Sequence, residues 1–139
     1  QIGAVQAVLK HTAWAAYVQP RRTPEWGRSA PAAFIAVLPG GESGELAADA
    51  GAAIENLLLR AHDLGLGACW IGAFLRADVA TLLALPPGRQ PLYLVAVGWP
   101  DESPCQDDIG ADGSPKYFLD AQDRLHVPKY TVAALAEWR

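Results

Sequence analysis

The run from Gly65 to Phe74, Gly-Leu-Gly-Ala-Cys-Trp-Ile-Gly-Ala-Phe, combines glycine and alanine with one tryptophan. Glycine and alanine leave backbone N–H and C=O groups within reach of a ligand, because they carry little or no side chain. A flat aromatic heterocycle could lie against such a strand and be hydrogen-bonded by its backbone. The same pattern is also typical of a helix cap at Gly65 followed by a tightly packed strand. The spacing alone leaves both interpretations open.

Catalysis by side chains has little support elsewhere in the sequence. The GxSxG, HExxH, GxxxxGK[ST] and GxGxxG motifs are absent, and His11, His62 and His126 are far apart. No His, Cys or carboxylate cluster has the spacing of metal ligands, so we expect no metal site and no catalytic side chain. Asp49 lies in the first turns of an expected helix, where a carboxylate favours the positive helix end. A site without an evident catalytic side chain or metal suits an organic cofactor that carries the reactivity itself.

Composition limits the class of protein. Of the 139 residues, 51% are hydrophobic and 19% are charged, as in one globular domain with its own core. The formal net charge of −4 argues against a nucleic-acid partner. No apolar run reaches the roughly 20 residues that span a bilayer, and no signal peptide is visible, so we expect a cytoplasmic protein without a membrane partner. Cys69 and Cys105 are expected to be reduced thiols.

The apolar spacing predicts helices and strands in alternation, which indicates a sheet with helices on its faces. We expect a buried central strand over 32–38 and a surface loop over 101–115. Arg21, Arg22 and Thr23 fall in an expected irregular loop over 20–31. The sequence begins at Gln1 and contains no methionine, so we expect a segment to be missing upstream. The other predicted elements are helices over 4–18, 45–64, 76–85 and 132–138, the last capped by Thr131, and strands over 91–98 and 125–129. The run 65–74 is expected to end the second helix and continue into a strand.

Several segments occur in an order and spacing that is specific to one known family. They are Asp49–His62, Leu64–Phe74, Leu85–Gly88 and Val95–Pro100, with Leu125–Lys129 in the tail. Together they resemble the FMN-dependent nitroreductase family, over residues 30–100 and the tail. The resemblance implies a single α+β domain, a three-layer α-β-α sandwich around a central mixed, mainly antiparallel sheet. It further implies a homodimer formed through long helices, with one FMN in each of two clefts at the subunit interface.

The resemblance also implies which residues contact FMN. Backbone N–H groups near Gly72 and Ala73 are expected to face flavin N5 and O4, where a preorganised donor stabilises charge on the reduced ring. By its position in the tail, Lys129 is similar to the basic residue that neutralises the FMN phosphate, although an exposed lysine after a proline is the alternative. The full expected set is Cys69, Trp70, Ile71, Gly72, Ala73 and Lys129.

Two parts of the family pattern are not visible in this sequence. Members carry an Arg-Arg-Ser type segment near the amino terminus and an Asn-x-Gln-Pro-Trp type segment near the ring. Arg21, Arg22 and Thr23 look similar to the first but come too late in the order, and Tyr130 stands where a second basic residue is often found. Either an amino-terminal region has been lost, or this is a shortened relative with weakened or altered flavin binding.

Two functions follow as expectations. The first is an oxidoreductase that passes electrons from NAD(P)H through FMN to a nitroaromatic, a quinone or a similar flat acceptor, or that uses FMN on a specialised substrate. The second is a non-catalytic dimerisation or ligand-binding domain of the same fold that has lost FMN. Flavin colour in the purified protein discriminates between them.

Overall fold

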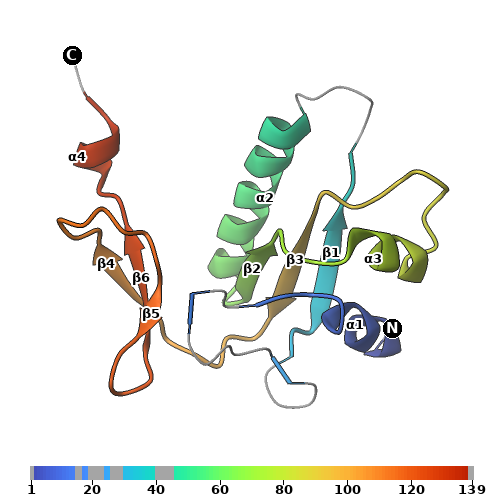
Figure 1. The fold of residues 1–139 in the computed structure, drawn as a ribbon, viewed down its shortest axis with the longest axis horizontal. Helices are drawn as coiled ribbons and strands as arrows, with labels where there is room; N and C mark the ends of the chain where they lie inside the picture. Colours follow the sequence, from blue (N-terminus) through green and yellow to red (C-terminus); the bar gives the residue numbers. More distant parts are fainter. Residues whose placement is uncertain (1, 15–16, 19–23, 26–29, 40–45, 138–139) are drawn as a thin grey trace. The chain divides into compact units, whose positions relative to one another are not determined.

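The computed structural model describes residues 2–14, 17–18, 24–25, 30–39 and 46–137 (Figure 1). The chain divides into two compact units, and each has its own three-stranded sheet. The amino-terminal unit comprises Gln1–Trp14 and Thr23–Pro100, and the carboxy-terminal unit comprises Ala15–Arg22 and Asp101–Arg139. The first contains α1 (Ile2–Leu9), β1 (Ala33–Val37), α2 (Leu46–Asp63), β2 (Gly67–Ile71), α3 (Arg76–Leu82) and β3 (Tyr93–Gly98). The second contains β4 (Cys105–Asp108), β5 (Phe118–Leu119), β6 (Leu125–Lys129) and α4 (Val132–Leu135).

The sheet of the amino-terminal unit is antiparallel, with the strand order β1-β3-β2. Its central strand β3 is apolar throughout, and Leu94, Val95 and Ala96 are 1%, 0% and 4% exposed. Burial of consecutive residues means that both faces of β3 are covered, because neighbouring side chains point to opposite faces. The prediction of a central strand over 32–38 is therefore wrong: β1 is an edge strand, and Ile35 in it is 40% exposed.

Helices cover both faces of this sheet (Figure 1). On one face, Leu94 and Ala96 form a buried cluster with Val8 of α1 and Val79 of α3. On the other face lies α2, where a Cβ at Gly51 would be 3.6 Å from the Trp70 ring. This arrangement, together with the mixed sheet of the carboxy-terminal unit, confirms the expected α+β class with antiparallel and mixed sheets.

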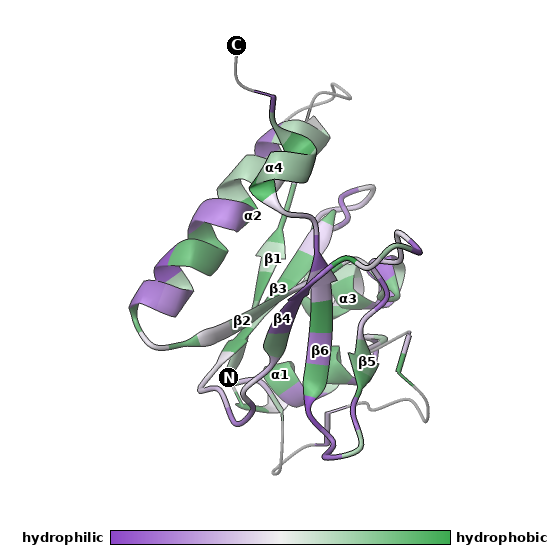
Figure 2. Cartoon of the chain, turned by 90° about the vertical axis from the view of Figure 1, so that its left-hand side faces the viewer, coloured by the Kyte–Doolittle hydropathy of each residue, from purple (hydrophilic) through white to green (hydrophobic). Residues whose placement is uncertain are grey.

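The long helix predicted over 45–64 is confirmed as α2, with Asp49 in its first turn. Figure 2 shows both hydrophilic and hydrophobic residues along it, and its buried residues Ala50, Ile54 and Ala61 have the spacing of one face of an amphipathic helix. Gly65 ends the helix with φ +74°, a conformation that glycine adopts without strain. The Gly65 N–H donates to the carbonyl of His62, and the Leu66 N–H donates to the carbonyl of Ala61, both at 2.9 Å. This pair of bonds is a Schellman cap, so the predicted cap at Gly65 is confirmed.

Most elements are shorter than predicted, and the differences at α1 and β2 bear on the site. The helix expected over 4–18 ends at Leu9, whose carbonyl accepts a 2.7 Å hydrogen bond from the Thr12 hydroxyl. The strand expected to continue to Phe74 ends at Ile71. The pairing of β2 with β3 ends at Ile71 and Leu94, and the chain after β2 bonds instead to the segment after α1, where the Ala13 N–H donates to the Ala73 carbonyl at 2.8 Å.

The sheet of the carboxy-terminal unit has the order β4-β6-β5, with β4 parallel and β5 antiparallel to β6. The extended segment predicted over 125–129 is confirmed as β6. The prediction of a loop over 101–115 missed β4, which pairs Cys105 with His126. In α4, the Ala134 N–H donates to the Thr131 hydroxyl oxygen at 3.2 Å, which confirms Thr131 as the helix cap.

Candidate functional site

The first candidate site lies where β2 ends, at the sheet edge of the amino-terminal unit. Gly72 and Ala73 follow the strand, and both are exposed. A Cβ atom built at Gly72 would meet no other atom within 4 Å, and Gly72 is not among the residues with positive φ. The fold itself therefore gives no steric reason for glycine at position 72. A bare backbone facing open space is the feature that a flat ligand requires.

The small residues at the start of β2 have a different role. A Cβ at Gly67 would lie 3.5 Å from the Pro100 side chain, so this glycine faces the chain itself. The small-residue run thus divides into a packed beginning and an open end. Of the two glycines at the ends of β2, Gly72 faces open space and Gly67 does not.

Trp70 forms one border of the open end. This residue is 39% exposed, and its ring makes an edge-to-face contact with Tyr93, with ring centroids 4.9 Å apart and planes at 85°. Such a pair holds the indole by aromatic packing, worth about 0.5–1.5 kcal/mol beyond its area. A partly exposed aromatic ring beside bare backbone gives a ligand one apolar surface and one polar surface.

The segment that follows α1 forms another border. The Ala13 N–H donates to the Ala73 carbonyl at 2.8 Å, and the Leu75 N–H donates to the His11 carbonyl at 2.9 Å. Thr12 and Phe74 form the β-bridge between these bonds. The amino-terminal segment thereby fixes the backbone just after Gly72.

The other residues predicted in β2 differ in their surroundings. Ile71 is 4% exposed, and its side chain belongs to the buried cluster that contains Leu94. Only the backbone of Ile71 can therefore contact a ligand. Cys69 is exposed, and its thiol lies 3.8 Å from the Trp70 carbonyl.

Lys129, the predicted phosphate contact, is the last residue of β6 in the carboxy-terminal unit. It is exposed, and its carbonyl accepts a 3.0 Å hydrogen bond from the Ile109 N–H. The structure describes the two units separately, so the association of Lys129 with Gly72 and Ala73 stays a prediction. Arg21, Arg22 and Thr23 lie outside the described residues.

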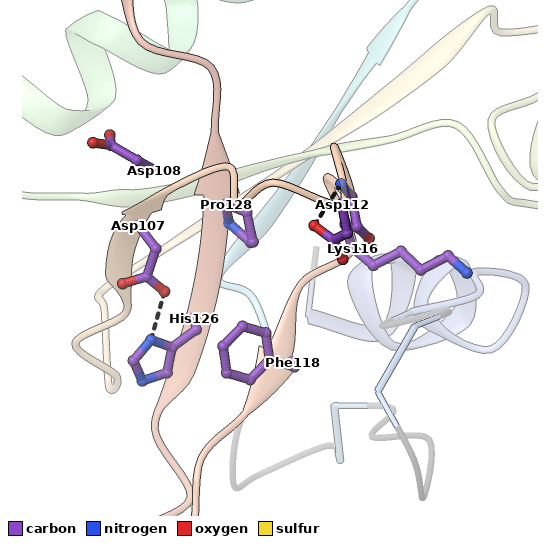
Figure 3. A pocket seen from close by; sticks show the side chains of 9 residues that line it. Asp107, Asp108, Asp112, Lys116, Phe118, His126 and Pro128 are labelled. Carbon is purple, nitrogen blue, oxygen red and sulfur yellow. Dashed lines mark hydrogen bonds and ion pairs between the residues drawn. The ribbon is translucent and has the colours of Figure 1, made fainter.

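A second candidate site is an open pocket of about 480 Å³ in the carboxy-terminal unit (Figure 3). Asp107 and His126 point toward one another, and Phe118 lies beside the imidazole. The Phe118 and His126 rings stack with centroids 4.9 Å apart and planes at 10°. The pocket is lined by Asp107, Asp108, Gly110, Asp112, Ser114, Lys116, Phe118, His126 and Pro128.

Both nitrogens of the His126 ring contact carboxylates. Nδ1 is 2.6 Å from Asp107, and Nε2 is 3.2 Å from Asp120. These contacts raise the pKa of His126, mainly through the hydrogen bond to Asp107. The pKa of Asp120 is lowered, first by the backbone N–H of Arg124 and also by His126. With both nitrogens occupied, His126 joins β6 to β4 and to the turn after β5 but is poorly placed to take a proton from a ligand.

This histidine cluster was not predicted from the sequence. Asp120 is six residues from His126, but Asp107 is 19 residues away, and the pairing of β4 with β6 brings it to His126. The described residues contain no group of His, Cys, Asp and Glu that could hold a metal ion. A smaller apolar pocket of about 110 Å³ lies in the amino-terminal unit, lined by residues of α1, β1 and β3 with Leu83. No described helix has both the length and the apolar character needed to cross a membrane.

Comparison with known proteins relates the amino-terminal unit to one family. The model of the nitroreductase family matches residues 4–99. A Methanothermobacter thermautotrophicus protein, provisionally named NADH dehydrogenase/NAD(P)H nitroreductase, is 33% identical over 86 residues, which are 59% of this chain and 40% of that protein. The chain therefore spans well under two thirds of the length of this relative.

One solved structure shows the same relationship at the level of the fold. A nitroreductase family protein from Clostridium novyi NT aligns with a TM-score of 0.52 and 22% identity, over 72% of this chain and 58% of that one. NADPH:FMN oxidoreductase from Vibrio harveyi, solved in complex with NAD+, aligns over 48% of this chain and 30% of its own with 35% identity and a TM-score of 0.41. Because the family model matches well over half of the sequence, this chain belongs to the nitroreductase family.

Proposed function

We propose that this chain is part of an FMN-dependent NAD(P)H oxidoreductase that reduces a nitroaromatic, a quinone or a similar flat acceptor. The observation that carries the proposal is the open backbone at Gly72, within the segment that matches the family. Membership of the family supports the flavin, and the name of the archaeal relative supports the nicotinamide.

The end of β2 fits the flavin ring in one testable respect. A Cβ at Gly72 would project into open space, so a planar ring could approach this backbone without displacing the protein's own atoms. The N–H groups of Gly72 and Ala73 are the proposed donors to the ring, and the exposed Trp70 face is a proposed apolar wall. Bound FMN supplies the transfer of two electrons from NAD(P)H to the acceptor.

The protein's own contribution is positional and electrostatic. Backbone donors are fixed in place by the surrounding hydrogen bonds, including the 2.8 Å bond from Ala13 to the Ala73 carbonyl. Fixed donors stabilise developing negative charge at no cost of reorganisation, which is how an enzyme without a catalytic acid or base can accelerate electron transfer. Lys129 is the proposed partner of the FMN phosphate, as a charged donor at the end of β6.

The proposal includes a homodimer in which the second subunit completes the cleft. Two exposed leucines support it: Leu59 of α2 and Leu64, which follows the helix, are 61% and 58% exposed in the single chain. A partner subunit that covered these side chains would remove apolar surface from water. Neither of the two pockets described above is lined by Gly72 or Ala73, so a single chain would hold only one side of the flavin.

A non-catalytic domain of the same fold, without FMN, is the competing function. The missing Arg-Arg-Ser and Asn-x-Gln-Pro-Trp segments favour it. The visible absorption spectrum of the purified protein, taken before and after addition of excess FMN and desalting, decides between the two. Retained flavin absorbance together with oxidation of NADH or NADPH by a nitroaromatic acceptor supports the enzyme. A protein that stays colourless and inactive contradicts it.

A further inference from the structure

Arg76 makes an unusual set of contacts at the end of β2. It is the first residue of α3, and its Nη2 donates to the Gly72 carbonyl at 3.3 Å and to the Leu92 carbonyl at 3.2 Å. The guanidinium carbon also lies 4.8 Å from the centre of the Phe74 ring. One cationic side chain thus contacts the open end of β2, the residue before β3 and the bridge residue Phe74.

These contacts hold the turn after β2 in place. Leu92 donates its own N–H to the Val37 carbonyl at 2.8 Å, so its backbone is already fixed to β1. By bonding to both Leu92 and Gly72, Arg76 ties the Gly72 carbonyl to a rigid part of the sheet. Both hydrogen bonds come from the one Nη2 group, whose N–H directions are fixed by the planar guanidinium fork.

The charge of Arg76 acts on the same peptide group. In the described part of the chain, no ion pair involves Arg76, so no described carboxylate within ion-pair distance neutralises its charge. The Gly72 carbonyl and the Ala73 N–H belong to one peptide unit. A charged donor on the carbonyl oxygen polarises this unit and makes its N–H a stronger donor, because hydrogen bonds in series strengthen one another.

We propose that Arg76 is a positioning residue for the Gly72–Ala73 peptide group, which it orients and polarises as a donor to the flavin. This inference rests on the proposed function, in which that peptide faces FMN. Arg76, whose side chain lies outside the ligand-facing backbone, would then tune the reduction potential of the flavin. Loss of the charge makes the reduced flavin less favourable and moves its midpoint potential to more negative values.

The test compares three variants with the wild-type protein. Arg76→Gln removes the charge, and Arg76→Lys keeps it while losing the fork of donors. Arg89→Gln is the matched control, because Arg89 is also exposed in the amino-terminal unit and its Nη2 donates to a backbone carbonyl, that of Pro39, at 3.2 Å. The readouts are the FMN midpoint potential, the FMN dissociation constant and the amide proton shift of Ala73 in the flavin-free protein.

For Arg76→Gln we expect a more negative midpoint potential, FMN binding weaker by at least about threefold and an upfield shift of the Ala73 amide proton. Arg76→Lys is expected to recover part of each effect, and Arg89→Gln to change none. If the wild type binds FMN and Arg76→Gln keeps its potential and affinity, the inference is overturned while the proposed function stands. If the wild type binds no FMN, the proposed function fails, and the Ala73 shift still tests the Arg76 contact. Should Arg76→Gln not fold, Arg76→Lys is compared with Arg89→Lys, and equal potentials overturn the inference.

Discussion

The Nδ1 atom of His126 lies 2.6 Å from a carboxylate oxygen of Asp107, and this pair joins β6 to β4 across the carboxy-terminal sheet. The His126 side chain is 20% exposed and is also stacked on Phe118. A partly buried imidazole between two carboxylates makes the carboxy-terminal unit sensitive to pH, because protonation decides whether the ring carries the complementary charge.

The stability of the carboxy-terminal unit is expected to depend on pH in a defined direction. The pKa of His126 is raised above 6.5, so its contribution to stability is complete below about pH 6.5 and is lost as the pH rises through the higher pKa of the folded state. The pKa of Asp120 is lowered below 3.8, so its contribution is present above 3.8 and is lost as the pH falls through the lower folded value. We therefore expect these contacts to stabilise the unit most between pH 3.8 and 6.5. An NMR titration of the His126 ring that yields a pKa of 6.5 or below would contradict this account, and Asp107→Asn is expected to lower the measured pKa.

Replacement of Gly72 by valine separates the ligand site from the fold. The new side chain would meet open space in the single chain, so the thermal unfolding midpoint is expected to stay close to that of the wild type. The same side chain would occupy the position proposed for the flavin ring, so FMN occupancy is expected to fall sharply. Gly3→Val is the control, because a Cβ at Gly3 also meets nothing within 4 Å. Unchanged flavin content in Gly72→Val would remove this residue from the site.

Lys129→Ala tests the proposed phosphate contact. If Lys129 forms a direct charge-assisted hydrogen bond, its loss is expected to weaken FMN binding by about ten- to a hundredfold. Riboflavin, which lacks the phosphate, is expected to bind both proteins equally. The control is Lys116→Ala, which removes an exposed lysine of the same unit that lies 5.9 Å from the Tyr17 ring. An FMN dissociation constant equal to that of the wild type would leave Lys129 as an ordinary surface residue.

The proposed dimer interface predicts a change in oligomeric state. Leu59→Glu places a charge at the exposed leucine of α2, and we expect it to convert a dimer into a monomer in light-scattering measurements. Leu82→Glu, on the exposed part of α3, is the matched control, since Leu82 is 45% exposed in the same unit. A dimer that survives Leu59→Glu, or a monomeric wild type, would count against an interface through α2.

The sequence predicted the local structure best where residues close in the chain determine it. The amphipathic spacing of α2, the cap at Gly65 and the hydroxyl cap at Thr131 all depend on neighbours within one or two turns. The apolar runs of β1 and β3 were both recognised as strands, but their order in the sheet was not. Strand order depends on pairing across more than fifty residues, and an apolar strand at an edge has the same composition as a central one.

In the candidate site, too, local features were predicted from the sequence and long-range contacts were not. The small residues of β2 predicted an accessible backbone, and the structure narrows it to the residues after Ile71. The Arg76 contacts were not predictable, because the carbonyl of Leu92 reaches this side chain only when β2 and β3 pair. The Asp107, Asp120 and His126 cluster was missed for the same reason, since β4 is short and polar and resembles a loop in the sequence.

The most direct test of the account is a titration of the protein with FMN followed by the amide shifts of the chain. The account predicts saturable binding with the largest shift changes at Trp70, Gly72 and Ala73. Absence of binding in excess FMN, or shift changes that avoid the end of β2, would contradict it.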